Sequence, residues 1–369
     1  MLSFGLALVL TVAPDAGVQH SAAMKEALDA VTTLTPWLPS PSAFREPANR
    51  QAISGAFDVF ARLKHPYLRK AGAPSAGVAN LFATQAERAR FDFERGNTES
   101  ARRRAQAMTQ LCIGCHLSEP RGDFAGAAKV VEALRLPPLQ RAEYFASTRQ
   151  IDRALEVWRA ELVRPVKVES ELYEQLDALR LAVRVVVSAK DDPKLVQQLL
   201  APQLKRKELP PFVRRELERW LQDAVAWEKE GFSKAAQKPA ALLEKAKVLL
   251  EASGAEKNVA PVPEQALKCL RAASYLDEAM RQDAEGPQRA ELLYFSGVAH
   301  GAVPDPALWE LEWTFFEACI RENPGTPIAQ VCAERLKERT WFAWRVGVDI
   351  PASTHAALGA LMALANGRK

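Results

Sequence analysis

The segment from Thr98 to His116 constrains the fold of this chain more than any other. Its inward-facing residues recur at spacings of four, three, four and three: Ala101, Ala105, Met108, Cys112 and Cys115. This period places them along one face of an α-helix, and such a face is stable only when it is buried. The pattern therefore predicts a helix that presents two cysteines on the face that packs against its neighbours.

Three further amphipathic segments precede this helix, at residues 21–34, 48–64 and 78–95. Each has apolar residues at helical spacing and is followed by proline or by a Gly-Asn pair, which end helices. Four such segments joined by short connections predict a four-helix bundle over residues 19–125.

The pentapeptide Cys112-Ile113-Gly114-Cys115-His116 dictates a specific chemistry. Two cysteines separated by two residues and followed by histidine are the attachment sequence of a covalent haem. The thiols of Cys112 and Cys115 can form thioethers with the haem vinyl groups, and His116 can bind the iron. We expect one covalently bound haem c, held by these three residues.

Other uses of the motif fit less well. A zinc site needs a second ligand pair, and Cys269, Cys319 and Cys332 do not repeat the spacing. A thioredoxin-like motif would follow a strand, whereas the residues before Cys112 predict a helix. A chance occurrence of the motif in a helical scaffold without haem stays open.

The N-terminal residues 1–18 resemble a signal peptide. An apolar run from Leu2 to Val12 precedes small residues around Ala13 and Ala16, although no basic residue precedes the run. The alternative is a buried first helix. Because covalent haem is attached outside the cytoplasm, export and the C-x-x-C-H motif support each other, and we expect a periplasmic protein. The apolar run is shorter than a membrane span, and no later segment reaches that length.

The length and net charge of the chain limit its domain count and the functional classes to which it can belong. The chain has 369 residues, which favours two domains, and a net charge of +4, which is too small to predict nucleic-acid binding. No nucleotide-binding loop, catalytic triad or H-E-x-x-H sequence is present. We expect a protein that is not an enzyme.

Residues 126–369 contain helical patterns divided by proline and glycine, without sustained alternation of polar and apolar residues. Segments 141–158 and 294–324 resemble the helical hairpins of tetratricopeptide arrays, although their period is not constant. The prediction is all-α: a four-helix bundle with covalent haem, followed by an array of helical hairpins whose surface docks a redox partner protein. Five tryptophans among apolar neighbours are expected in the core: Trp158, Trp220, Trp309, Trp313 and Trp341.

The other cysteines allow one disulfide. Cys319 and Cys332 flank a turn at residues 323–326, and antiparallel helices could bring them together in an oxidising compartment. Cys269 would be left unpaired as a small buried side chain. His300 and His355 have no partner pattern and are interpreted as structural or surface residues.

Residues 20–125 resemble the class II cytochromes, the cytochrome c-prime group, in the four amphipathic segments and in the motif near the end of the last one. The resemblance implies an antiparallel bundle in which Cys112 and Cys115 are the thioether residues and His116 is the proximal ligand. It also suggests Arg121 as a partner for a haem propionate. Class I cytochromes carry the motif near the domain start, so they are disfavoured.

The resemblance makes the sixth iron ligand the open question. Met24, in the first helix, stands where some class II proteins place a methionine ligand; the alternative is that it only fills the core. His20 is a weaker candidate. With a ligand, we expect electron transfer; without one, the alternative is a five-coordinate haem that binds or senses NO or CO. The resemblance leaves homodimer formation open.

Overall fold

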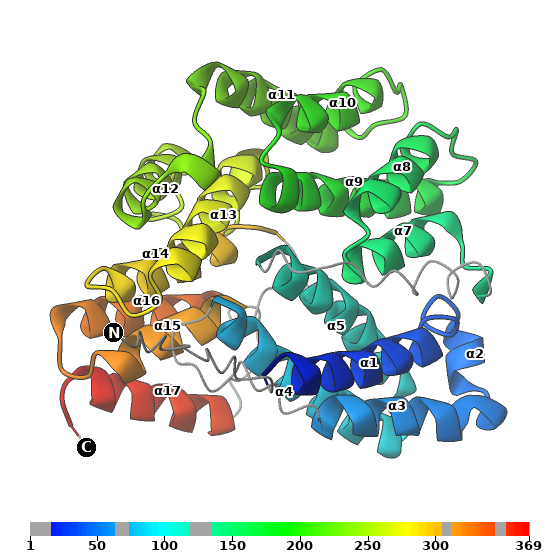
Figure 1. The fold of residues 1–369 in the computed structure, drawn as a ribbon, viewed down its shortest axis with the longest axis horizontal. Helices are drawn as coiled ribbons and strands as arrows, with labels where there is room; N and C mark the ends of the chain where they lie inside the picture. The colour runs from blue at the N-terminus through cyan, green and yellow to red at the C-terminus, as the bar shows by residue number, and fades with distance from the viewer. Residues whose placement is uncertain (1–15, 63–73, 119–133, 305–310, 344–351, 369) are drawn as a thin grey trace, which may run out of the picture.

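All regular structure in the described residues is helical. The computed structural model describes residues 16–62, 74–118, 134–304, 311–343 and 352–368. Figure 1 shows these helices as a continuous succession around the molecule. The predicted all-α class is confirmed, whereas residues 1–15, which contain most of the predicted signal peptide, lie outside the described part.

The four amphipathic segments form helices close to their predicted bounds. Only a short helix between prolines was not predicted: its Ser40 side chain accepts a hydrogen bond from the Ala43 amide at 3.2 Å and caps five residues. The N-terminal elements are α1 (Ala16–Leu34), α2 (Pro41–Arg45), η1 (Pro47–Asn49), α3 (Arg50–Arg62), α4 (Pro74–Glu94) and α5 (Thr98–Ser118).

These helices share a core of aromatic and small side chains. The rings of Phe44, Phe57 and Phe93 contact one another edge to face, with centroids 5.6 to 6.4 Å apart. Ala89 and Ala101 are 0% exposed, and their small side chains let α4 and α5 pack closely. Gly96, between these two helices, has φ +85°, which supports its predicted role as a C-cap.

The remaining helices form an arc around the end of α5 (Figure 1). The arc begins beside α1, passes over α5 and returns to α4, which α15 contacts. Its elements are α7 (Pro138–Ser147), α8 (Ile151–Leu162), α9 (Glu169–Val185), η3 (Val186–Lys190), α10 (Pro193–Gln203), α11 (Pro211–Glu230), η4 (Lys234–Ala236), α12 (Pro239–Ser253), η5 (Pro263–Gln265), α13 (Ala266–Gln282), α14 (Arg289–Gly301), α15 (Leu311–Glu322), α16 (Pro327–Ala343) and α17 (Ala352–Ala365).

Consecutive helices of the arc pair as hairpins, including α7 with α8 and α14 with α15, the two that the sequence suggested. In the second hairpin a Cβ on Gly297 would lie only 2.6 Å from the ring of Phe316, so the absence of a side chain lets these helices approach.

The tryptophans divide between core and surface. Trp158 and Trp220 are buried as expected, and Trp313 is half-buried. Trp341 is 57% exposed, so its predicted core position is wrong. Helical spacing predicts which residues share a face but not what covers that face, and in the last turns of α16 the buried residue is Thr340. Trp309 lies outside the described residues.

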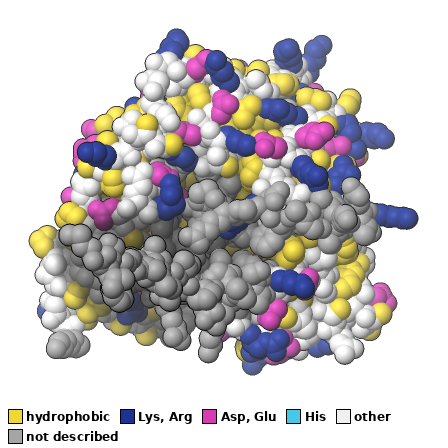
Figure 2. Space-filling view, in the orientation of Figure 1, with side chains coloured by type: hydrophobic (Ala, Val, Ile, Leu, Met, Phe, Trp, Pro, Cys, Tyr) yellow, Lys and Arg dark blue, Asp and Glu magenta, His cyan; other side chains and the backbone are white. Residues whose placement is uncertain are grey.

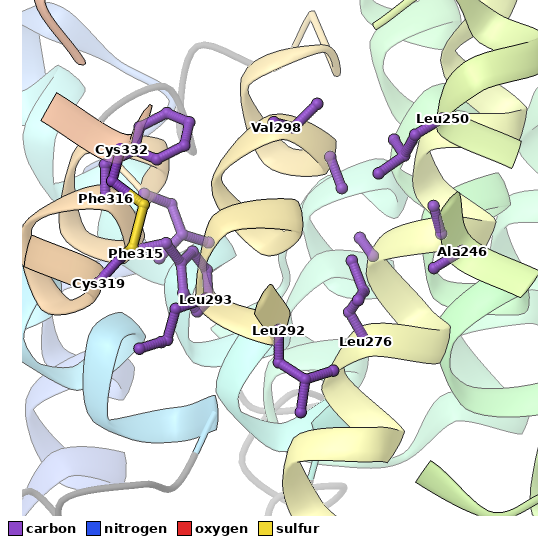
Figure 3. Packing of buried hydrophobic residues seen from close by; sticks show 14 of the residues in the cluster. Ala246, Leu250, Leu276, Leu292, Leu293, Val298, Phe315, Phe316, Cys319 and Cys332 are labelled. Carbon is purple, nitrogen blue, oxygen red and sulfur yellow. A yellow bond between two sulfur atoms is a disulfide. The ribbon is translucent and has the colours of Figure 1, made fainter. Parts of the chain in front are cut away.

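Cys319 and Cys332 form a disulfide that joins α15 to α16, as the sequence suggested. Both cysteines are 0% exposed and belong to a hydrophobic core that also contains Phe315, Phe316 and Leu293 (Figure 3). The bridge therefore fixes the last hairpins of the arc.

Candidate functional site

Helix α5 passes from one hydrophobic core into two others. Its first half contributes Ala101, Ala105 and Met108 to the core of the N-terminal helices. One turn later, Leu111 enters the core formed mainly by α12 to α17, and Ile113 enters the core formed mainly by α7 to α11. Both of these side chains are 0% exposed. The C-x-x-C-H motif therefore lies where the three cores meet.

The motif occupies the last turns of α5. Cys112 is half-buried, whereas the side chains of Cys115 and His116 lie outside the described residues. Because the backbone stays helical through Ser118, Cys112 and Cys115 stand about one turn apart on one face. His116, four residues after Cys112, stands on the same side of the helix.

A buried arginine from the arc lies against this motif. The Nη2 atom of Arg184 lies 2.9 Å from the position that a Cβ on Gly114 would occupy, closer than real Cβ contacts allow. Arg184, on α9, is only 7% exposed. It comes just before the π-helical turn η3, which packs against α5. Such turns are rare and often occur at functional sites.

Three further ionisable groups share this region. Burial raises the pKa of Asp277 to about 6, against the opposing effect of Lys234 and Arg184. Burial lowers the pKa of Lys234, whose ammonium donates hydrogen bonds to Ser188 O at 2.5 Å and Ser274 Oγ at 2.7 Å. Burial, and secondarily the charge of Arg184, lowers the pKa of His300 to about 3. Arg184 thus places a buried cation beside the end of α5, and its charge acts on both Asp277 and His300.

In the described part of the chain the ring of His300 has no hydrogen-bond partner, and the Ser296 hydroxyl one turn earlier on α14 has none either. The imidazole stacks on Phe315, with centroids 5.2 Å apart and planes inclined by 8°. Within the described ranges, neither ring nitrogen makes a hydrogen bond. The residue still keeps some accessible surface, so the ring borders a space that its neighbours do not fill.

The other predicted ligands are only partly placed. Met24 lies on α1, one turn before Leu28, and Leu28 packs against the core that contains Ile113. The side chains of Met24 and His20 lie outside the described residues, as does Arg121. The Thr32 hydroxyl is 2.7 Å from the Tyr144 hydroxyl, which ties α1 to α7. Met24 therefore remains a prediction.

The residues present fit a covalently attached haem. The helical backbone places residues 112 and 115, both cysteines, on one face, and a histidine follows them in the sequence. The glycine between the thiols creates room that Arg184 occupies, and a buried guanidinium suits the carboxylates of a haem. The arc supplies this buried cation, because Arg184 lies on α9.

Sequence reasoning did not find Arg184, Asp277 or His300 as site residues. They lie on three helices of the arc, far along the chain from Cys112. Single basic or acidic residues within amphipathic helices carry no signal that would connect them to a motif elsewhere. His300, interpreted as a structural or surface residue, is partly exposed and stacks on Phe315.

Among the residues that the structure describes, no group of three or more His, Cys, Asp or Glu side chains could hold a metal ion. None of the described helices is both long enough and apolar enough to cross a membrane. Comparisons with protein-family models, curated proteins and solved structures find no match to this chain.

Proposed function

We propose that the chain is a periplasmic monohaem c-type cytochrome that transfers electrons, and that its helical arc docks a redox partner. The C-x-x-C-H motif on the last turns of α5, enclosed by the arc and contacted by Arg184, carries the proposal. The buried Cys319–Cys332 disulfide supports an oxidising compartment.

The residues of the chain have separate roles in this proposal. Cys112 and Cys115 hold the haem covalently, and His116 binds its iron, which supplies a one-electron ferric–ferrous couple. Leu111 and Ile113 exclude water beside the motif. Arg184 places a fixed positive charge there, which disfavours further positive charge and so favours the reduced state.

The arc offers a polar surface for a partner. On the face in Figure 2, basic and acidic side chains are interspersed among apolar ones over the arc helices. Such a mixed surface suits a transient complex, which an electron carrier needs for turnover.

The test is covalent haem staining of protein matured in a periplasm that attaches haem. We expect staining that survives denaturation and is lost in the Cys112→Ala/Cys115→Ala double variant. His355→Ala, which changes an exposed histidine on α17, is the matched control and should stain like the wild type. Absence of stain from the wild type would leave the helical scaffold without haem as the better account.

The spectrum of the stained protein then separates the two haem functions. A low-spin ferric spectrum supports electron transfer. A high-spin spectrum that shifts on addition of NO or CO would favour the gas-binding alternative.

A further inference from the structure

An enclosed histidine without a polar partner is unusual. Buried polar groups are almost always hydrogen-bonded, and a neutral imidazole has one donor and one acceptor to satisfy. Within the described part of the chain the ring of His300 has only the stacking contact with Phe315, at a centroid distance of 5.2 Å. An imidazole without a hydrogen-bond partner would be satisfied by a metal ion bound to one of its ring nitrogens.

The ring is also in the right chemical form to bind a metal. Within the described residues no hydrogen bond uses either nitrogen of the His300 ring, so a ring nitrogen can serve as a ligand atom. A neutral imidazole nitrogen is a common axial ligand of haem iron.

Its position relates it to the motif through two sets of contacts. Arg184 lies against Gly114 and also acts electrostatically on His300. Leu111, just before Cys112, belongs to the same hydrophobic core as Val298 on α14, the helix that carries His300. Figure 3 shows Val298 in this core together with Leu293 and Phe315. The end of α5 and the end of α14 therefore belong to the same interior region.

The other candidate groups here are already engaged. Lys234 is hydrogen-bonded to Ser188 and Ser274. The Cys269 thiol donates to Ser253 Oγ at 3.5 Å, and burial raises its pKa to about 11, so it stays protonated. Met24 and His20, whose side chains lie outside the described residues, are the remaining alternatives.

We propose that His300 is the second axial ligand of the haem iron, supplied by the arc, so that the iron has two imidazole ligands. This inference rests on the proposed function. It makes the arc part of the redox centre, because one ligand would come from α5 and the other from α14.

The experiment compares ferric holoproteins whose covalent haem content is first measured by staining. Wild type is expected to be low-spin, with the near-infrared magnetic circular dichroism of bis-imidazole coordination. His300→Ala should keep its covalent haem and become high-spin, and added imidazole should restore the low-spin spectrum. Met24→Ala and His355→Ala should both keep the wild-type spectrum.

Several results would overturn the assignment. A high-spin wild type, a methionine–iron signature in the wild type, or an unchanged spectrum in His300→Ala would each exclude His300. Loss of the low-spin state in Met24→Ala would assign the ligand to Met24. Because other histidines could also supply an imidazole, His20→Ala and His65→Ala are measured as well and should keep the wild-type spectrum. Loss of the bis-imidazole signature in either variant would exclude His300, even if His300→Ala folds poorly. Wild type without covalent haem would instead contradict the proposed function.

Discussion

The guanidinium of Arg184 occupies the space that a side chain on Gly114 would need, with Nη2 2.9 Å from the position of a Cβ atom. An alanine at 114 would therefore have to displace a buried charged group by several tenths of an ångström. This contact joins the C-x-x-C-H motif to the arc, and its effect on stability can be measured.

The first prediction concerns this contact. Gly→Ala within a helix usually stabilises by about 1 kcal/mol. Gly55→Ala, on α3, meets nothing within 4 Å and should show that gain. In urea unfolding, the stability gain for Gly114→Ala should be about 1 kcal/mol smaller than the gain for Gly55→Ala, because Arg184 must move. In an Arg184→Ala background the shortfall should vanish; if it persists there, the two residues are not coupled.

The second prediction concerns the hairpin of α14 and α15. Gly297→Ala places a Cβ 2.6 Å from the Phe316 ring, which is buried and cannot swing away. We expect a loss of about 2 kcal/mol in the free energy of unfolding, despite the better helix propensity of alanine. Phe316→Leu should reduce that loss. Gly359→Ala, in open space on α17, is the control, and equal effects at the two glycines would refute the close packing.

The third prediction concerns the Cys319–Cys332 disulfide, which spans 13 residues. A double Cys→Ala variant should lose roughly 3 kcal/mol of stability, mainly because its unfolded chain is less constrained. Reduction of the wild type should lower its thermal midpoint to about that of the double variant. A reducing agent should leave the midpoint of the double variant unchanged, and any similar shift there would show that the effect does not come from this bridge.

The fourth prediction is a pH dependence. Burial, with a smaller contribution from Asp177, raises the pKa of Glu143 from 4.5 to about 7. Between these values the folded state binds more protons than the unfolded state, so this group lowers stability as pH rises from about 4.5 to 7. Glu143→Gln should remove that slope and stabilise the protein at pH 8 by roughly 1–3 kcal/mol. Parallel stability curves for wild type and variant would contradict the shift.

The sequence predicted the N-terminal helices well because each is amphipathic over several turns and has a clear stop signal. Helix α2 was missed because five residues between prolines are too few to show a period. The π-helical turn after Val185 was also missed: its residues have ordinary helical composition, and the change in hydrogen-bond register depends on packing against α5 and α13.

The candidate site could be predicted only as far as its local motif. Cys112, Cys115 and His116 are adjacent, and their chemistry follows from spacing alone. Arg184 and His300 come from helices far along the chain. The packing of η3 against α5 places Arg184 at Gly114, and the charge of Arg184 in turn acts on His300. The same limitation explains why the core position predicted for Trp341 is wrong: its apolar neighbours in the sequence do not cover its side chain in the fold.

The passage of α5 through three cores also bears on how the molecule melts. Leu111 and Ile113 lie within the first predicted domain, but their packing partners lie mostly beyond residue 125. Cutting the chain at that boundary would expose two large aliphatic side chains beside the motif and remove contacts from both halves. Heating should therefore give one calorimetric transition instead of two, and the N-terminal segment produced alone should aggregate more readily than the intact chain.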